Sequence, residues 1–93
     1  MKGGGYVGKV LITVGSVTSA SRLEKYLRKK KGIKASVVHT PAEINNGGCS
    51  YSLRIDASNL SRIREAIKEI DVAVRKLYME DYYEGEKKYH VIS

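Results

Sequence analysis

The chain has 93 residues, of which 42% are hydrophobic, and a formal net charge of +7 at pH 7. This length suits one domain with a single modest core, and no apolar run approaches the roughly 18 residues that a membrane-spanning helix needs. The N-terminus has no apolar segment of the kind found in secretory signal peptides. Cys49 is the only cysteine, so no intramolecular disulfide can form, which fits a reducing compartment. These features predict a cytoplasmic protein that does not enter a membrane.

The charge is distributed unevenly along the chain. Residues 1–79 hold 15 Lys and Arg against 6 Asp and Glu, whereas residues 80–93 hold 2 against 4. A basic body raises the local concentration of anionic partners, which include nucleic acids, nucleotides and acidic proteins. Net charge alone does not choose among them.

The first third of the chain predicts a strand followed by a helix. After a flexible, glycine-rich segment over 1–8, residues 9–14 (KVLITV) are apolar on both faces, which is typical of a central strand. Thr18 or Ser19 is expected to cap the helix, because a hydroxyl there can accept a hydrogen bond from the backbone. Gly32 is expected to end the helix, directly behind a run of four basic residues.

The rest of the chain predicts further strands and a second helix. Pro41 stops the second strand because it lacks a backbone donor. The second helix carries an apolar stripe at helical spacing, which is a strong periodic signal. The expected elements are a strand over 33–40, a strand over 50–56, a helix with its stripe at Leu60, Ile63, Ile67 and Ile70, a strand over 72–78, and a tail that can add a short strand over 89–92.

The order of these elements, β-α-β-β-α-β, is that of the ferredoxin-like fold. We therefore expect an α/β (α+β) sandwich in which two helices cover one face of a four-stranded antiparallel sheet. The domain is expected to span 9–79, followed by a polar, tyrosine-rich tail over 80–93. In that fold the connection after the first strand and the connection between the second and third strands lie at the same end of the sheet.

The second of these connections is a polar, glycine-bearing loop that carries the cysteine. Gly47 and Gly48 allow backbone angles that a Cβ would forbid, and Cys49 follows them directly. The expected geometry sets this thiol opposite residues 15–19, close to the N-terminus of the first helix. Unpaired N–H groups and the helix dipole favour an anion at such a position.

A thiolate near a helix N-terminus is a chemical candidate, because the thiolate and not the thiol is the nucleophile and sulfur acceptor. Free cysteine has a pKa near 8.5, so its surroundings must lower that pKa for the thiolate to dominate. The amides of a glycine loop can hold an anion. Ser16, Thr18 and Ser19 can donate hydrogen bonds to it, and His39, at the end of the second strand, can reach the mouth of the loop.

Simpler roles for the same residues stay open. A lone cysteine is often a buried small hydrophobe, and the glycines before it can serve only to make a tight turn. The hydroxyl residues after Gly15 can act only as helix caps. His39 can be an exposed strand-end residue rather than a base.

Four short motifs together resemble one family of small bacterial proteins. They are Gly15-Ser16-Val17-Thr18-Ser19-Ala20, Arg22-Leu23-Glu24, Thr40-Pro41 and Gly48-Cys49. The family they resemble is described as putative selenium/sulfur carrier protein-like, and the resemblance covers nearly the whole expected domain. It implies that Cys49 holds sulfur or selenium and that residues 15–20 form the opposing wall.

The implied activity is that of a carrier rather than of an enzyme with its own turnover. Cys49 would accept the chalcogen from a desulfurase-like donor as a persulfide or selenosulfide and pass it to an acceptor enzyme, with no cofactor. The basic body would help docking to an acidic partner. The candidate site comprises Cys49 as the carrier thiol, surrounded by Gly15, Ser16, Thr18, Ser19, His39, Thr40, Pro41, Gly47 and Gly48.

Other classes of function make different demands on the sequence. RNA-recognition folds stack bases on aromatic residues of their central strands, where this chain has only Tyr51, so nucleic acid is not the expected partner. A ligand-binding or homo-oligomeric regulatory module stays open as an alternative, because such domains can pair through edge strands. A metal site is not expected, since Cys49, His39 and His90 lack the spacing of metal ligands.

Overall fold

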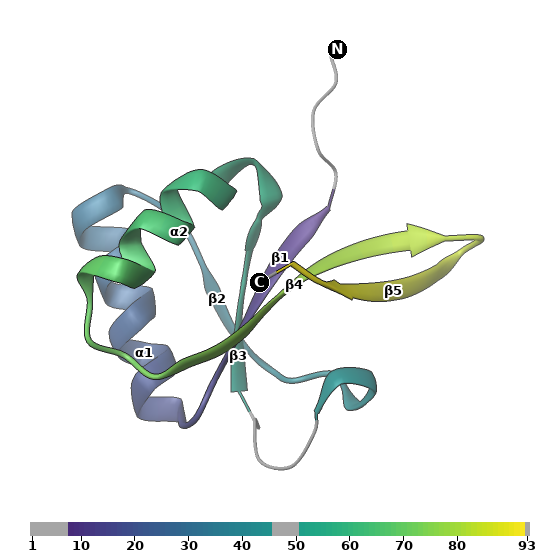
Figure 1. Ribbon diagram of the computed structural model, residues 1–93, viewed down its shortest axis with the longest axis horizontal. Coiled ribbons are helices and arrows are strands. Elements are labelled where there is room, and N and C mark those ends of the chain that lie inside the picture. Colours follow the sequence, from purple (N-terminus) through teal and green to yellow (C-terminus); the bar gives the residue numbers. More distant parts are fainter. Residues whose placement is uncertain (1–7, 46–50, 93) are drawn as a thin grey trace.

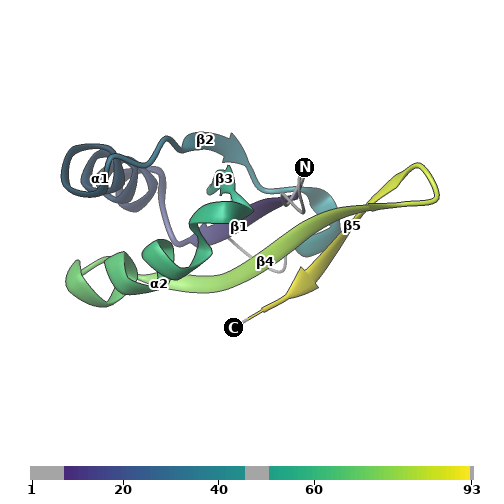
Figure 2. The ribbon, with the colours of Figure 1, turned by 90° about the horizontal axis from the view of Figure 1, so that it is seen from above.

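An antiparallel sheet forms one layer of the molecule, and helices form a second layer on one of its faces (Figures 1 and 2). The computed structural model describes residues 8–45 and 51–92. Within these residues the strands are β1 (Lys9–Val14), β2 (Ser36–His39), β3 (Tyr51–Asp56), β4 (Val74–Tyr83) and β5 (Glu86–Val91), and the α-helices are α1 (Val17–Tyr26) and α2 (Leu60–Glu69). The mixed α/β class that the sequence predicts is confirmed. None of the described helices is both long and apolar enough to cross a membrane.

Across residues 8–45 and 51–92 the sheet has five strands in the order β2-β3-β1-β4-β5, and each neighbouring pair is antiparallel. The prediction of four strands is therefore wrong. The difference arises in the tail, because β4 continues to Tyr83 and the chain then turns back as β5. Glu84 and Gly85 make this turn with φ angles of 52° and 81°, the geometry of a tight two-residue hairpin loop.

The main core lies between the helices and the sheet. β1 is central and its side chains from Val10 to Val14 are buried on both faces, as its apolar sequence predicts. Full burial of a large aliphatic side chain contributes roughly 1.5–3 kcal/mol, so this layer supplies most of the apolar stabilisation. Its buried members from the strands and the two α-helices are Val10, Ile12, Val14, Ala20, Leu23, Leu53, Ile55, Ile63, Ala66 and Leu77.

The face of the sheet opposite the helices has a smaller core of its own. Leu11 and Tyr78 are paired across β1 and β4, and both are buried together with Ile44. Ile44 comes from a short 3-10 turn (Ala42–Ile44) that follows β2. Tyr89 of β5 packs against the same group, so the fifth strand helps to close this face.

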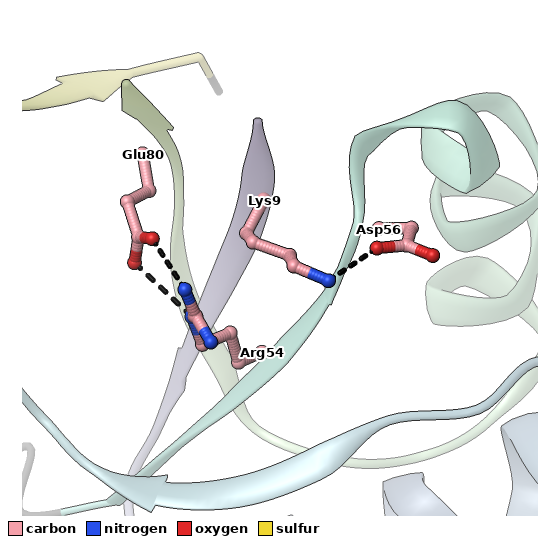
Figure 3. Close-up of polar contacts among 4 residues, drawn as sticks. All are labelled: Lys9, Arg54, Asp56 and Glu80. Atoms are coloured by element: carbon pink, nitrogen blue, oxygen red, sulfur yellow. Dashed lines mark hydrogen bonds and ion pairs between the residues drawn. The ribbon is translucent and has the colours of Figure 1, made fainter. Parts of the chain in front are cut away.

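Two ion pairs lie near the end of β1 at which Lys9 begins the strand (Figure 3). Arg54 of β3 contacts Glu80 of β4, with 2.7 Å between Nη2 and Oε2 and 3.3 Å between Nε and Oε1. Lys9 contacts Asp56. Because β1 lies between β3 and β4, the Arg54–Glu80 pair joins two strands that share no backbone hydrogen bonds. The hydrogen bond to Glu80 raises the pKa of Arg54 above its usual value.

The C-terminal end of α1 widens before it stops. Residues Leu27–Lys31 form a π-helical turn, which the N–H of Gly32 closes by donating to the carbonyl of Leu27. The N–H of Ile33, beyond the turn, donates to the same carbonyl at 3.0 Å. Gly32 then takes a left-handed conformation with φ 66°, as predicted for the residue that ends the helix.

Candidate functional site

Four strand ends meet at the C-terminal end of β1. Val14 is paired with Tyr51 of β3 on one side and with Val74 of β4 on the other, and Tyr51 is paired with His39 of β2. These four residues define what we call the Val14 end of the sheet. The connection from β1 to α1 leaves from this end, so the first turn of α1 lies beside it.

Ser16 is the N-cap of α1. Its backbone is extended (φ −157°, ψ 162°), and its Oγ accepts a 3.1 Å hydrogen bond from the backbone N–H of Ser19. The two hydroxyl oxygens, Ser16 Oγ and Ser19 Oγ, are 3.2 Å apart. The prediction that Thr18 or Ser19 caps the helix is wrong, because the helix already begins at Val17 and both hydroxyl residues lie inside it.

The first turn of α1 is an electropositive spot at the Val14 end. The leading N–H groups of an α-helix have no acceptor within the helix, and the helix dipole adds about half a positive charge there. The Oγ of Ser16 already accepts a hydrogen bond from one of these groups, the N–H of Ser19. Val17 and Thr18, which follow the cap, are exposed.

His39 lies at this same end, against the first residue of β3. Its ring centroid is 5.1 Å from that of Tyr51, with the two planes tilted by 32°. His39 is exposed and Tyr51 is half-buried against the helix-side core. The contact holds the imidazole at the Val14 end rather than leaving it free on the edge strand.

Thr40 and Pro41 are directed elsewhere. Thr40 Oγ1 lies 2.7 Å from Ser52 Oγ, and both side chains are buried. Pro41 begins the 3-10 turn that carries Ile44 to the face opposite the helices. The Thr40 hydroxyl is thus engaged with Ser52 within the sheet layer.

Sequence reasoning missed one cation at the Val14 end, that of Arg75. A Cβ added to Gly15 would lie 3.6 Å from Nη2 and 3.7 Å from Nε of Arg75, so the guanidinium group lies alongside the β1–α1 connection. The register of β4 against β1 shifts between Thr13 and Val14, which inserts Arg75 as an extra residue. Arg75 is exposed and forms no ion pair with any residue that the structure describes.

The geometry therefore brings part of the predicted site together. Cys49, Gly47 and Gly48 lie outside the described residues. The members found at the Val14 end are Gly15, Ser16, Thr18, Ser19 and His39, joined by Tyr51 and Arg75. Within the described ranges there is no cluster of three or more His, Cys, Asp or Glu that could hold a metal ion. A helix N-terminus, hydroxyl groups and a guanidinium are suited to stabilising a small anion.

Comparison with protein families gives one match, over residues 9–79, to the family described as putative Se/S carrier protein-like. The match covers most of the chain, from the start of β1 to Met79 in β4. The chain belongs to this Se/S carrier-like family. The resemblance drawn from the short motifs is thereby confirmed. In this Se/S carrier-like protein the matched region ends within β4, so β5 lies beyond it. Neither the curated proteins nor the solved structures include a match to the chain.

Proposed function

We propose that this Se/S carrier-like protein holds sulfur or selenium on Cys49, as a persulfide or selenosulfide, and passes it from a donor enzyme to an acceptor enzyme. The observation that carries the proposal is the family match over 9–79, a range that contains the single cysteine. A thiolate can act first as the nucleophile and later as the leaving group in such exchange. The reducing cytoplasm is the compartment in which an unpaired thiol persists.

The transfer requires two substitutions at sulfur and no external oxidant. The Cys49 thiolate attacks the terminal sulfur of a donor persulfide, the donor S–S bond breaks, and the donor thiolate leaves. A nucleophile of the acceptor then attacks the outer atom, and the Cys49 thiolate is released. A selenosulfide follows the same course with selenium as the outer atom. Each step exchanges one bond for another, so the demands on the protein are a lowered thiol pKa and access.

The Val14 end offers the electrostatics that a thiolate needs. We take β1 to β4 as a ferredoxin-like unit, because the elements alternate as βαββαβ and the strands lie in the order β2-β3-β1-β4. Cys49 precedes Tyr51 by two residues in the sequence, and two residues of extended chain span about 7 Å at most. We therefore propose that the thiol acts beside the N-terminus of α1 and that the positive charge of Arg75 favours its thiolate form.

The pH dependence of Cys49 alkylation tests this proposal. We expect the native thiol to react with an apparent pKa well below the ~8.5 of free cysteine, and to gain one sulfur atom in mass after treatment with glutathione persulfide. Arg75→Met should raise that pKa, because it removes a positive charge from the Val14 end. Lys76→Met is the matched control, since Lys76 is the next residue of β4 and is paired with Thr13, whereas Arg75 lines the surface between β4 and α2.

The outcome against the proposal is equally clear. A thiol that is alkylated only after unfolding is core packing and cannot carry a chalcogen. A Cys49→Ser variant that still gains sulfur would show that the mass change arises elsewhere.

A self-associating regulatory module is the second candidate, and the edge of the sheet favours it. Among the described residues no strand pairs with the outer side of β2, and Val37 on that strand is exposed. An open edge is a template for pairing with a second copy. Size-exclusion chromatography across a range of protein concentrations separates this candidate from a monomeric carrier.

A further inference from the structure

A shallow depression lies between the second half of α1 and the residue that follows α2, Ile70. Its volume is about 280 Å³, and it opens to solvent far along the helix from the Ser16 cap. Its surface is almost entirely apolar, so its arginine and lysine residues line it mainly with the methylene parts of their side chains, beside a tyrosine and an isoleucine. The residues that line it are Arg22, Lys25, Tyr26, Lys29, Lys30 and Ile70, and we call this group the α1 depression.

The four cations of the α1 depression are unpaired within the described structure. None of them forms an ion pair or side-chain hydrogen bond with a described residue. Their neighbours differ, because Arg28 is paired with Glu24 at 3.0 Å and Lys31 with Glu69 at 2.9 Å. The protein thus pairs the adjacent positive charges and leaves unpaired those of the side chains that line the depression.

Helix geometry brings these charges together. Arg22 and Lys25 are three residues apart on α1, so they share one face of the helix. Lys29 and Lys30 add two further charges from the π-helical turn that follows. Tyr26 is fixed in place, because its hydroxyl donates a 2.7 Å hydrogen bond to Oε1 of Glu69 on α2. The result is a group of cations beside a held apolar surface.

We propose that the α1 depression docks an acidic segment of a partner protein. One apolar side chain of that segment packs on Tyr26 and Ile70, while flanking carboxylates contact the four cations. Charge complementarity steers the encounter, and the buried apolar contact fixes the register. The residues that line this surface are not those of the Val14 end, so the inference does not depend on the proposed chalcogen transfer.

The apolar surface is what distinguishes a polypeptide from a nucleic acid here. A phosphate backbone matches the cations but has no aliphatic side chain for Ile70. Proteins that hold single strands without sequence preference stack successive bases on several aromatic rings. The α1 depression has only one aromatic residue, Tyr26, so it offers no row of rings for successive bases. An acidic peptide with an apolar anchor satisfies both features of the site.

Fluorescence anisotropy with defined probes tests the inference. The first probe is a short labelled peptide with one leucine between two runs of glutamate; the second has serine in place of that leucine; the third is a labelled oligouridylate. Lys25→Glu combined with Lys29→Glu should weaken binding of the leucine peptide by about tenfold or more, since two attractive contacts become repulsive. Replacing the leucine with serine should weaken it by about tenfold, because the apolar contact is lost.

The matched control is Lys87→Glu combined with Lys88→Glu on β5, which changes the net charge equally at an exposed site away from α1. It should change the affinity by less than about twofold. A milder pair, Lys25→Gln with Lys29→Gln, keeps the test valid if the charge reversal disturbs the helix; circular dichroism checks the fold of each variant. The inference is overturned if the control weakens binding as much as the α1 pair. It is overturned equally if the serine peptide binds as well as the leucine peptide, if oligouridylate binds more tightly than either, or if no peptide binds.

Discussion

At the scale of single residues, the Arg54–Glu80 pair is unequal. The side chain of Glu80 is 3% exposed, whereas that of Arg54 is 35% exposed. Water can therefore solvate Arg54 if its partner is removed, but it reaches Glu80 poorly. Removing one partner of a buried ion pair is costly because the other charge is left without compensation.

We expect Arg54→Met to destabilise the protein by about 2–3 kcal/mol, because it leaves the carboxylate of Glu80 buried and unpaired. Glu80→Met should destabilise it by about 1 kcal/mol. Both costs are below those for a fully buried pair, because Arg54 is partly solvated. The double variant should recover much of the loss, since no unpaired charge then remains. Urea unfolding measures all three. Lys9→Met is the control: its pair with Asp56 is exposed, so its effect should be smaller than about 1 kcal/mol. A larger cost for Glu80→Met than for Arg54→Met would contradict this account.

Glu69 makes stability depend on pH at both extremes. Hydrogen bonds from Tyr26 and Lys31 lower the pKa of Glu69 from its ordinary 4.5. Its contribution to stability is therefore present above pH 4.5 and is lost as the pH falls through the lowered pKa. The hydrogen bond to Glu69 raises the pKa of Lys31 above 10.5, so that contribution is present below pH 10.5 and is lost as the pH rises further.

Glu69→Gln should accordingly flatten the loss of stability below pH 4.5, because the glutamine cannot take up a proton. The measurement is the urea midpoint of the variant and of the unmodified protein between pH 7 and pH 3. Glu65→Gln, an exposed change on the same helix, should leave the loss of stability below pH 4.5 unchanged. Identical curves for Glu69→Gln and the unmodified protein would show that this carboxylate is not responsible.

At the scale of elements, the start of α1 depends on one hydroxyl. Ser16 accepts the N–H of Ser19, whereas Thr18 lies one residue inside the helix and is exposed. A side-chain cap is worth about 1 kcal/mol, and aspartate at the same position can replace it.

Ser16→Ala should therefore lower the free energy of unfolding by about 1 kcal/mol, and Ser16→Asp should restore it. Thr18→Ala should be nearly neutral, because Thr18 does not cap the helix. Chemical denaturation compares the three variants. Equal losses for Ser16→Ala and Thr18→Ala would mean that the helix has no fixed start.

The helical elements were predictable because their signals are local. The stripe of Leu60, Ile63 and Ile67 repeats at helical spacing, and the structure forms α2 over Leu60–Glu69. Ile70, expected to continue the stripe, is instead extended (φ −112°, ψ 141°) where the chain leaves the helix. Its apolar side chain still packs against the core, so the pattern predicted its burial but not its backbone.

The features that the sequence did not predict depend on how strands pair with one another, which sequence patterns encode weakly. Three hydroxyl residues could each have capped α1, and the choice of Ser16 follows from where β1 ends. Arg75 gives no signal, because its position depends on a register shift between β1 and β4. The fifth strand did leave a trace: a glycine, Gly85, sits between two runs of strand-forming residues, as in a hairpin.

At the scale of the whole molecule, the basic and acidic side chains lie on different parts of the structure. Four unpaired cations gather on α1 and the turn that follows it, whereas the acidic residues of the tail lie along β4 and β5, which project away from the helices (Figure 1). The matched family region also ends at Met79, one residue before the last pairing of β4 with β1 at Glu80. The hairpin is thus distinct from the family domain in both charge and position.

That hairpin has a consequence for amide hydrogen exchange. β1 and β5 both pair with β4 only at Tyr78–Glu80, and beyond this point the strand pairs with β5 alone. Tyr82 and Tyr83 at the outer part are 66% and 67% exposed, and an isolated two-stranded ribbon is marginally stable. We expect amides over 81–88 to exchange through local opening that is insensitive to denaturant, and those of β1 to exchange only through global unfolding. Equal protection of the two regions in native-state exchange would contradict this. The expected result means that one continuous sheet contains two thermodynamic units, and that the outer ribbon opens many times for each opening of the body.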